Sequence, residues 1–274
     1  MNKELYKNKF LENKNLIDQE ISRYFDKNLK IEEAMAYALE EGKRVRANLF
    51  LESRRLSTKE ISKNDLLFAL AIEMIQAYSL VHDDLPAMDD DDFRRGKESV
   101  HKHFGEDLGI LTGDALLSEA AKLVVEISIK DPSYLKAGAY LLDKTGAHGM
   151  IDGQILDLRR NDYDQDFLIE VYDKKTAEFF KGCLVAGGLV NDFDKDELSA
   201  LENYGYYLGL GFQIQDDLLE DDYGDEINVL NLMDYDRAKS WLDEINGKCR
   251  KEIECFKNNE MLLYLIDFLA KREY

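Results

Sequence analysis

Apolar residues recur through most of this 274-residue chain at the three- and four-residue spacing of amphipathic helices. One such stripe passes through Leu67, Leu70, Ala71, Met74, Ile75, Tyr78 and Val81. No alternating apolar run is bounded by hairpin turn residues, and only two prolines interrupt the chain. The pattern predicts an all-α protein of ten or more helices, at about 2–24, 30–41, 43–56, 63–84, 106–130, 133–142, 145–159, 166–190, 195–219, 235–257 and 259–272.

Capping residues support two of these helix starts. Asp131 followed by Pro132 is typical of an N-cap and a proline at the first helical position. Asp194 with Glu197 three residues later resembles a capping box. No linker-like stretch separates the helices, so we expect a single domain over residues 1–274.

The chain is strongly acidic, with a formal net charge of −20 at pH 7. A surface of this sign repels nucleic acid and anionic membranes, so we expect neither as a stable partner. Three scattered cysteines form no metal or disulfide spacing, and the first residues lack the apolar core of a secretion signal. With no uninterrupted apolar stretch long enough to span a membrane, these features predict a soluble protein of the cytoplasm.

A first acidic run extends from His82 to Gly96. Runs of this kind are more often solvated surface loops. Here, however, Asp83 and Asp84 end an apolar helix rather than lying in a polar linker. Pro86 breaks that helix, so Asp89 can turn back towards Asp83. We therefore expect these carboxylates to converge.

Two arginines, Arg94 and Arg95, follow at once and supply a basic fork beside the carboxylates. The run does not fit an EF-hand, because it lacks the alternating ligands and the distal glutamate of that loop. Carboxylates with few other ligand types favour magnesium or manganese, held by one or two side chains and by substrate phosphates. An anionic substrate would require such cations, together with a basic patch, to reverse the acidic field.

A second acidic run spans Gly211 to Asp222 and again follows a long apolar helix. Gln213 and Asp217 are four residues apart, as are Asp216 and Glu220, so each pair shares one helix face. Like charges on adjacent turns cost stability unless a cation compensates them. Two such clusters in one helical chain favour metal binding over two solvated acidic surface segments.

Both runs belong to an ordered series of motifs that resembles the short-chain trans-isoprenyl diphosphate synthases of the polyprenyl synthetase family, most closely the bacterial farnesyl diphosphate synthases. The first run is similar to the family's first aspartate-rich motif. The other matching segments are Gly42 to Arg46, Phe104-Gly105, Leu111 to Leu116, Gly149 to Asp157, Lys175-Thr176 and Gly211 to Asp217. The resemblance covers most of the chain and implies the isoprenoid synthase fold, a helical bundle around a central cavity, in a homodimer.

The resemblance also implies roles for individual residues in a prenyltransferase that condenses isopentenyl diphosphate with dimethylallyl or geranyl diphosphate. Magnesium ions, three in number, would be held by Asp83, Asp84, Asp89 and Asp216. The substrate diphosphates would be bound by Lys43, Arg46, Gln76, Arg94, Arg95 and Lys175. Lys175 would also help to ionise the allylic ester. Thr176 and Gln213 would contact the substrate and turn oxygen dipoles towards its carbocation.

The chain departs from the family pattern at three places. Gln76 stands where a histidine often contacts isopentenyl diphosphate, although glutamine still donates a hydrogen bond. Glu220 replaces the usual third aspartate of the second motif. The loop with two lysines that normally follows is missing, and no lysine lies between Lys195 and Lys239. A weakly active or silent homologue that serves as a partner subunit is therefore an alternative, and a terpene cyclase is another.

Tyr78 lies five residues before Asp83, about 7.5 Å along a helix. An aromatic ring there can close the floor of the cavity that receives the growing chain, and by resemblance such enzymes tend to stop at fifteen carbons. A core tyrosine on the apolar stripe is the structural alternative. We favour farnesyl diphosphate as the product, with geranyl and geranylgeranyl diphosphate as alternatives.

Overall fold

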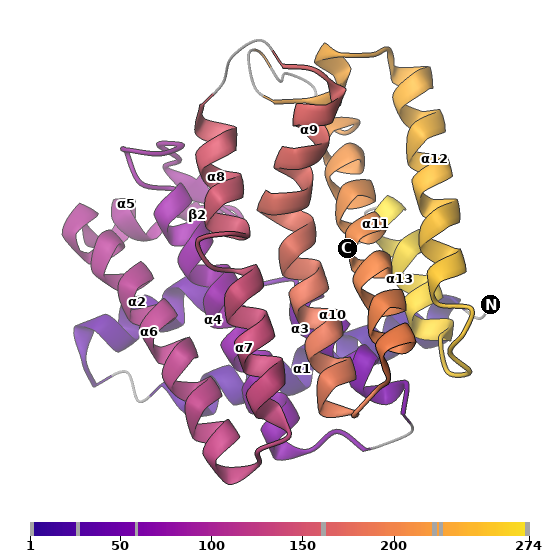
Figure 1. Cartoon of the computed structure of the whole chain (residues 1–274). Coiled ribbons are helices and arrows are strands. Elements are labelled where there is room, and N and C mark those ends of the chain that lie inside the picture. The colour runs from indigo at the N-terminus through magenta and orange to yellow at the C-terminus, as the bar shows by residue number, and fades with distance from the viewer. Residues whose placement is uncertain are drawn as a thin grey trace. The chain divides into compact units, whose positions relative to one another are not determined.

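The computed structural model describes residues 3–25, 28–57, 60–159, 163–220, 224 and 227–271. Helices dominate these ranges (Figure 1), which confirms the predicted all-α class. The α-helices are α1 (Lys3–Tyr24), α2 (Lys30–Leu39), α3 (Val45–Arg55), α4 (Lys63–Asp83), α5 (Val100–Phe104), α6 (Glu106–Lys130), α7 (Tyr134–Lys144), α8 (Met150–Leu158), α9 (Gln165–Tyr172), α10 (Glu178–Val190), α11 (Lys195–Asp217), α12 (Tyr235–Glu252) and α13 (Glu260–Lys271). One turn of π-helix, Asp173–Ala177, joins α9 to α10 and is called the π-turn below. A 3₁₀-helix, Val229–Asn231, precedes α12.

Where predicted and observed helix starts differ, the cause is local. α3 begins at Val45 rather than at 43, because Arg44 has a φ of 58°, outside the helical region. α8 begins at Met150 rather than at 145, because the chain turns tightly at Gly149. A Cβ on this glycine would lie 1.9 Å from the carbonyl oxygen of Lys144.

One capping prediction is confirmed and the other is wrong. Asp194 accepts hydrogen bonds from the backbone of α11, and the Glu197 carboxylate accepts one from the amide of Asp194 at 2.9 Å. Asp131 instead ends α6 and accepts from the amide of Ser133 at 3.1 Å, so α7 begins only at Tyr134. The competing Asx turn explains the difference, because Asp131 bonds to the residue two positions later.

Two further features were not predicted. The helix expected over 166–190 is interrupted by the π-turn, which an apolar spacing rule does not reveal. The first acidic run leads into a small antiparallel hairpin in which β1 (Phe93–Arg94) pairs with β2 (Lys97–Glu98). Strands of two residues are too short to show an alternating pattern, so the sequence contained no usable strand signal.

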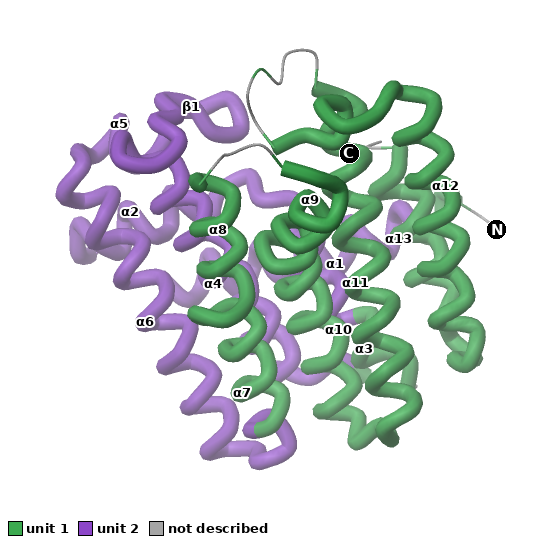
Figure 2. The backbone as a smooth tube through the Cα atoms, turned by 45° about the horizontal axis from the view of Figure 1, so that its top comes forward, with its two compact units in different colours: residues 1–6, 52–60, 136–274 green, residues 7–51, 61–135 purple. Residues whose placement is uncertain are grey.

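The chain forms two compact units (Figure 2). Unit 1 comprises residues 1–6, 52–60 and 136–274, and unit 2 comprises residues 7–51 and 61–135. The single domain expected over the whole chain stays a prediction.

The core of unit 2 is built on α4, which packs along α6. Phe68 of α4 is fully buried and stacks on Phe50, with 4.7 Å between the ring centroids. At the start of α4, Ser62 and Asp65 form a capping box, and the buried Asp65 also accepts from the Tyr134 hydroxyl at 2.7 Å. These contacts fix the start of the helix whose opposite end carries the first acidic run.

The core of unit 1 is built on α10 and α11, which pack against each other. A cluster of buried apolar residues that includes Leu168 of α9 and Leu210 and Ile214 of α11 extends this core. Gly209 lets α11 approach the π-turn closely, since a Cβ at this position would lie 2.5 Å from the Cα of Ala177. The π-turn is therefore held against a rigid helix.

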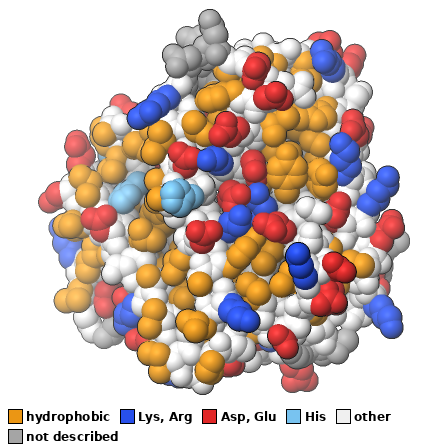
Figure 3. Space-filling view, in the orientation of Figure 1, with side chains coloured by type: hydrophobic (Ala, Val, Ile, Leu, Met, Phe, Trp, Pro, Cys, Tyr) orange, Lys and Arg blue, Asp and Glu red, His pale blue; other side chains and the backbone are white. Residues whose placement is uncertain are grey.

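Of the described helices, α4 is long and apolar enough to cross a membrane by length and composition. However, 67% of its apolar window is buried inside the protein, as in the core helix of a globular protein. Acidic side chains are spread over the whole face seen in Figure 3 rather than gathered in one patch. Positive charge for an anionic ligand must therefore come from a few local residues.

Candidate active site

The first acidic run begins at the C-terminal end of α4 and turns back on itself. Asp83 is the last residue of α4, and Asp84 caps it. The amide of Asp89 donates to the carbonyl of Asp83 at 2.9 Å, and the amide of Asp91 donates to the carbonyl of Asp84 at 3.2 Å. The backbone thus brings residue 89 beside residue 83, as the break at Pro86 predicted.

The carboxylate of Asp84 is engaged by an arginine. Its side chain is 4% exposed and accepts from Arg94 Nε at 2.8 Å and from Arg94 Nη2 at 2.5 Å. Asp91 accepts from Arg94 Nη2 at 2.9 Å. Burial raises the pKa of Asp84, and the hydrogen bond from Arg94 opposes that rise. Asp84 therefore orients Arg94, whereas Asp83 and Asp89 lie nearer the surface.

Both predicted arginines sit on the β1–β2 hairpin. Arg95 and Gly96 are its two loop residues, with φ values of 55° and 79°, which is the geometry of a type I′ turn. Glycine suits the second position because it has no Cβ. The tight loop carries Arg94 and Arg95 next to each other at one end of α4.

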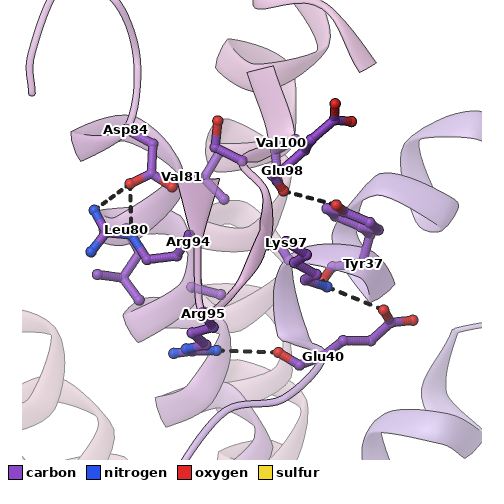
Figure 4. Close-up of a pocket in the computed structure, with 13 residues that line it drawn as sticks. Tyr37, Glu40, Leu80, Val81, Asp84, Arg94, Arg95, Lys97, Glu98 and Val100 are labelled. Atoms are coloured by element: carbon purple, nitrogen blue, oxygen red, sulfur yellow. Dashed lines mark hydrogen bonds and ion pairs between the residues drawn. The ribbon is translucent and has the colours of Figure 1, made fainter. Parts of the chain in front are cut away.

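The hairpin is attached to α2 by contacts that were not predicted (Figure 4). Lys97 Nζ donates to the carbonyl of Tyr37 at 2.7 Å and lies 3.1 Å from Glu40 Oε2 and 3.7 Å from the centre of the Tyr37 ring. The Tyr37 hydroxyl donates to the carbonyl of Glu98 at 2.8 Å. The same residues line a cavity of about 30 Å³, room for one or two water molecules. These contacts restrain the arginine-bearing loop.

The basic motif before α3 lies close to Arg95. A Cβ on Gly42 would lie 3.3 Å from a guanidinium nitrogen of Arg95 and 2.1 Å from one of Arg44. Arg44 points into the core, while Lys43 is exposed and Arg46 is half-buried. Burial lowers the pKa of Arg95, which makes its positive charge more costly to keep without an anion nearby.

Gln76 and Tyr78 lie on α4, below the acidic end. Gln76 is half-buried, three residues after the buried Glu73. Tyr78 is 6% exposed, and its hydroxyl has no hydrogen-bond partner among the described residues. Burial, with a smaller effect of Asp83, raises the pKa of Tyr78 to about 12. Tyr78 is therefore a neutral aromatic ring at physiological pH.

In unit 1, the predicted catalytic residues Lys175 and Thr176 lie on the π-turn, and Gln213 lies on α11. Lys175 Nζ is 2.5 Å from Asp157 Oδ2 on α8, and the neighbouring Lys174 pairs with Asp152, five residues earlier on the same helix. Gly153 permits this contact, since a Cβ there would lie 2.2 Å from the backbone nitrogen of Lys175. π-turns of this kind are frequent at functional sites.

Thr176 and Gln213 are brought together, as the resemblance implied. The Thr176 hydroxyl donates to Gln213 Oε1 at 3.0 Å. Asp216 follows three residues later on the last turn of α11 and is half-buried. The π-turn and the end of α11 thus place a hydroxyl, an amide and a carboxylate on neighbouring elements of unit 1.

Asp217 performs a structural task. It is 5% exposed and accepts from the Tyr172 hydroxyl and, at 2.6 Å, from the amide of Val229. Burial raises the pKa of Asp217 to about 7, and these two hydrogen bonds oppose the rise. Asp217 therefore ties α11 to the 3₁₀-helix.

The chain after the second acidic run is also anchored at Asn228. The Tyr163 hydroxyl donates to the Asn228 carbonyl at 3.0 Å and accepts from the Asn228 amide at 2.9 Å. The side-chain amide of Asn228 donates to Glu220 at 3.1 Å. The lysine loop of the family would fall in this stretch, of which residues 221–223 and 225–226 lie outside the described part of the chain.

Among the described residues, no group of three or more histidine, cysteine, aspartate or glutamate side chains closes around one point as a metal cage. The donors at Asp83 and Asp89 are nevertheless hard oxygens at the end of one helix. Magnesium commonly takes only one or two carboxylates and completes its shell with water and substrate phosphates. The residues present fit such an open site, not a closed cage.

Comparison with known proteins decides the family. A model of the family described as polyprenyl synthetase matches residues 28–230. The chain belongs to the polyprenyl synthetase family. It is 32% identical to the farnesyl diphosphate synthase of Bacillus subtilis (strain 168), over 95% of this chain and 96% of that protein. It is 34% identical to geranylgeranyl pyrophosphate synthase 7, chloroplastic, of Arabidopsis thaliana, over 89% and 77% of the two chains.

A solved structure supports the same conclusion for the fold of this polyprenyl synthetase. The FPP/GFPP synthase from Zymomonas mobilis superposes with a TM-score of 0.91 at 30% identity, over 98% of this chain and 99% of that chain. The predicted isoprenoid synthase fold and the predicted prenyltransferase class are confirmed. The chain is a trans-prenyl diphosphate synthase of the farnesyl and geranylgeranyl type, and the names of its relatives leave the product length open.

The polyprenyl synthetase motifs did not reveal every residue that positions this site. Asp157 lies in one of the matching motifs, but nothing in its 18-residue separation from Lys175 indicates that the two form an ion pair. Tyr37 and Lys97 are 60 residues apart and likewise meet only through tertiary structure. Tyr172 occupies an apolar position of its helix, so its hydrogen bond to Asp217 was not predictable from the sequence.

Proposed function

We propose that this polyprenyl synthetase makes farnesyl diphosphate by condensing isopentenyl diphosphate with dimethylallyl or geranyl diphosphate. The observation that carries the proposal is the turn that returns Asp89 to Asp83 beside the hairpin of Arg94 and Arg95. Carboxylates for cations and guanidinium groups for phosphate are thereby gathered at the end of one helix. A silent partner subunit would have no use for this arrangement.

Asp83 and Asp89, with Asp84 behind them, would hold magnesium at this end of α4, and Asp216 would hold a further ion in unit 1. Three ions in total, with manganese able to take their place, follow from the family resemblance. The bound cations would neutralise the allylic diphosphate and stabilise it as a leaving group. Their positive charge would also reduce the repulsion between an anionic substrate and a protein of net charge −20.

The basic residues of the chain would bind the two diphosphates separately. Arg94, held by Asp84, would contact the allylic diphosphate together with Lys175. Lys43, Arg46 and Arg95 would bind the diphosphate of isopentenyl diphosphate, with a hydrogen bond from Gln76. The contact of Gly42 with Arg95 supports a shared basic patch.

Thr176 and Gln213 would stabilise the allylic carbocation through their oxygen dipoles. Their hydrogen bond at 3.0 Å fixes the Gln213 carbonyl and leaves the lone pairs of the Thr176 oxygen for the cation. Lys175 would exchange its partner Asp157 for the diphosphate during ionisation. The double bond of isopentenyl diphosphate then attacks the cation, and loss of a proton completes the product.

A product assay tests this function. The purified protein is incubated with magnesium, labelled isopentenyl diphosphate and each allylic primer in turn, and the product lengths are measured. We expect a fifteen-carbon diphosphate, and no product after chelation of the divalent cations. Absence of turnover at high enzyme concentration would favour the partner-subunit alternative, and ring-containing hydrocarbons or alcohols would indicate a cyclase.

We also infer that the enzyme is a cytoplasmic homodimer. The outer face of α6 supports a dimer, because Ile110, Leu111, Val125 and Ile129 are 49%, 53%, 55% and 77% exposed. Sedimentation equilibrium should give twice the mass of the chain. A monomer at micromolar concentration would contradict this inference.

Replacing Tyr78 should change the product length. In Tyr78→Ala we expect products longer than fifteen carbons, because removal of the buried ring opens space along α4. Tyr78→Phe is the matched control. It keeps the ring and removes a hydroxyl that has no described partner, so its product should stay at fifteen carbons. A fifteen-carbon product from a folded Tyr78→Ala enzyme would refute the role of the ring.

A further inference from the structure

The π-turn that carries Lys175 and Thr176 is spanned by a buried lysine. Lys181 lies on the first turn of α10, and only 8% of its side chain is exposed. Its ammonium nitrogen is 2.7 Å from Asp173 Oδ1 and 2.7 Å from Glu178 Oε1. Asp173 is the first residue of the π-turn, and Glu178 is the residue immediately after it. One buried cation thus contacts both ends of the turn.

The pairing of Asp173 with Lys181 depends on the π-turn itself. The two residues are eight positions apart, and in an uninterrupted α-helix they would be rotated by about 80° around the axis, since each residue turns about 100°. A π-turn accommodates one extra residue. Asp173 and Lys181 therefore stand as residues seven apart would, within about 20° of a common face. The lysine side chain leans towards the N-terminus of its helix and so reaches back to Asp173.

The surroundings make this ion pair hard to replace by water. Gly205 of α11 packs on the backbone of Lys181, where a Cβ would lie 2.9 Å from the lysine Cα. Burial would lower the pKa of Lys181, but its ion pairs with Asp173 and Glu178 outweigh burial and raise it. Lys181 therefore stays charged. Lys144 lies 2.8 Å from Glu178 Oε2 and forms the outer part of the same network, whereas the ion pair with Asp173 is made by Lys181.

We propose that Lys181 is a positioning residue. It keeps residues 173–177 in the π-helical conformation, here called the π register, and thereby holds Lys175 and Thr176 in place for the allylic substrate. The inference rests on the proposed function of those two residues. Without the ammonium group, Asp173 gains nothing from the π register, and the turn can relax towards an α-helix. That change rotates Lys175 away from its position opposite Asp157.

The variant Lys181→Met tests this inference, because methionine is unbranched and apolar and removes only the charge from a buried site. We expect kcat with an allylic primer to fall by about 10- to 100-fold, as for a catalytic group displaced by about 1 Å. The KM for isopentenyl diphosphate should stay within about twofold, since its proposed ligands lie elsewhere. A wild-type kcat, or an equal loss of affinity for both substrates, would overturn the proposal.

Lys144→Met is the matched control, because it removes a cation from the same Glu178 but leaves the ion pair of Lys181 with Asp173 in place. Its kcat should stay within about threefold of the wild type, and an equal loss in both variants would refute the register argument. If Lys181→Met does not fold, the triple variant Asp173→Asn, Glu178→Gln, Lys181→Met removes the unpaired buried charges. The triple variant should fold and keep the low kcat, and full activity in it would contradict the proposal.

Amide hydrogen exchange gives a readout that does not depend on activity. Residues 173–178 should exchange faster in Lys181→Met than in the wild type, while Lys144→Met should leave them unchanged. An inactive wild-type protein would count against the proposed function, whereas unchanged exchange in Lys181→Met would count against the positioning role alone. The two failures are therefore distinguishable.

Discussion

Replacing Asp83 by asparagine should lower the rate of product formation by about 100- to 1,000-fold, as loss of a charged group at a diphosphate-stabilising site commonly does. Asparagine keeps the size of the side chain and removes one negative charge from the end of α4. The apparent magnesium concentration for half-maximal rate should rise as well, because a neutral amide is a weaker ligand for a hard cation. Initial rates measured across a magnesium titration would give both quantities.

Asp92→Asn is the matched control for this experiment. Asp92 lies on the same acidic run but is exposed and pairs with Lys102 at 2.8 Å, outside the proposed ligand set. Its loss changes the local charge by the same amount and should alter the rate by no more than about twofold. If Asp83→Asn retained a tenth of the activity, or if both variants lost equally, the proposed metal site would be wrong.

Replacing Arg44 by methionine should lower the free energy of unfolding by about 3–5 kcal/mol, the usual cost of removing one partner from a buried ion pair. Arg44 and Glu73 are each 4% exposed, with 3.2 Å between Nη1 and Oε2. Arg44 Nη2 also donates to the carbonyl of Leu39 at 2.5 Å, and its Nε donates to Asp18 at 2.8 Å. The variant leaves Glu73 charged and buried, so the melting temperature should fall by roughly 6–20 °C.

Two comparisons separate the buried pair from a general charge effect. Lys14→Met removes the half-exposed pair of Lys14 with Asp18 and should cost no more than about 0.5 kcal/mol. The double variant Arg44→Met, Glu73→Gln should recover part of the stability, because it no longer buries an unpaired charge. Equal melting temperatures for Arg44→Met and Lys14→Met would show that Arg44 has no such structural role.

Arg44 also illustrates how far a motif can be interpreted without a structure. The motif from Gly42 to Arg46 indicated a basic patch, and three of its residues are cations. Spacing alone does not distinguish Lys43, which is exposed, from Arg44, which is buried in an ion pair. The φ of 58° at Arg44 turns its side chain inward, and that angle is a property of the folded backbone.

The second acidic run shows the same limit. Asp216 and Asp217 are adjacent and chemically identical in the sequence. In the structure Asp217 is buried, accepts from Tyr172 and Val229, and has its pKa raised to about 7, chiefly by burial. Asp216 is half-buried at the end of α11. Their different environments arise from α9 and the 3₁₀-helix, which pack on one side of α11.

The sequence by itself determined the all-α class, most helix positions, the family and the residue types of the site. Helical periodicity and aspartate-rich motifs are local, so they can be recognised in a short stretch of chain. Only the tertiary structure decided which cations are bound by neighbours, as Arg94 is by Asp84 and Lys175 is by Asp157. It also decided the π register held by Lys181. These features depend on distance and burial between residues remote in the sequence, which no spacing rule encodes.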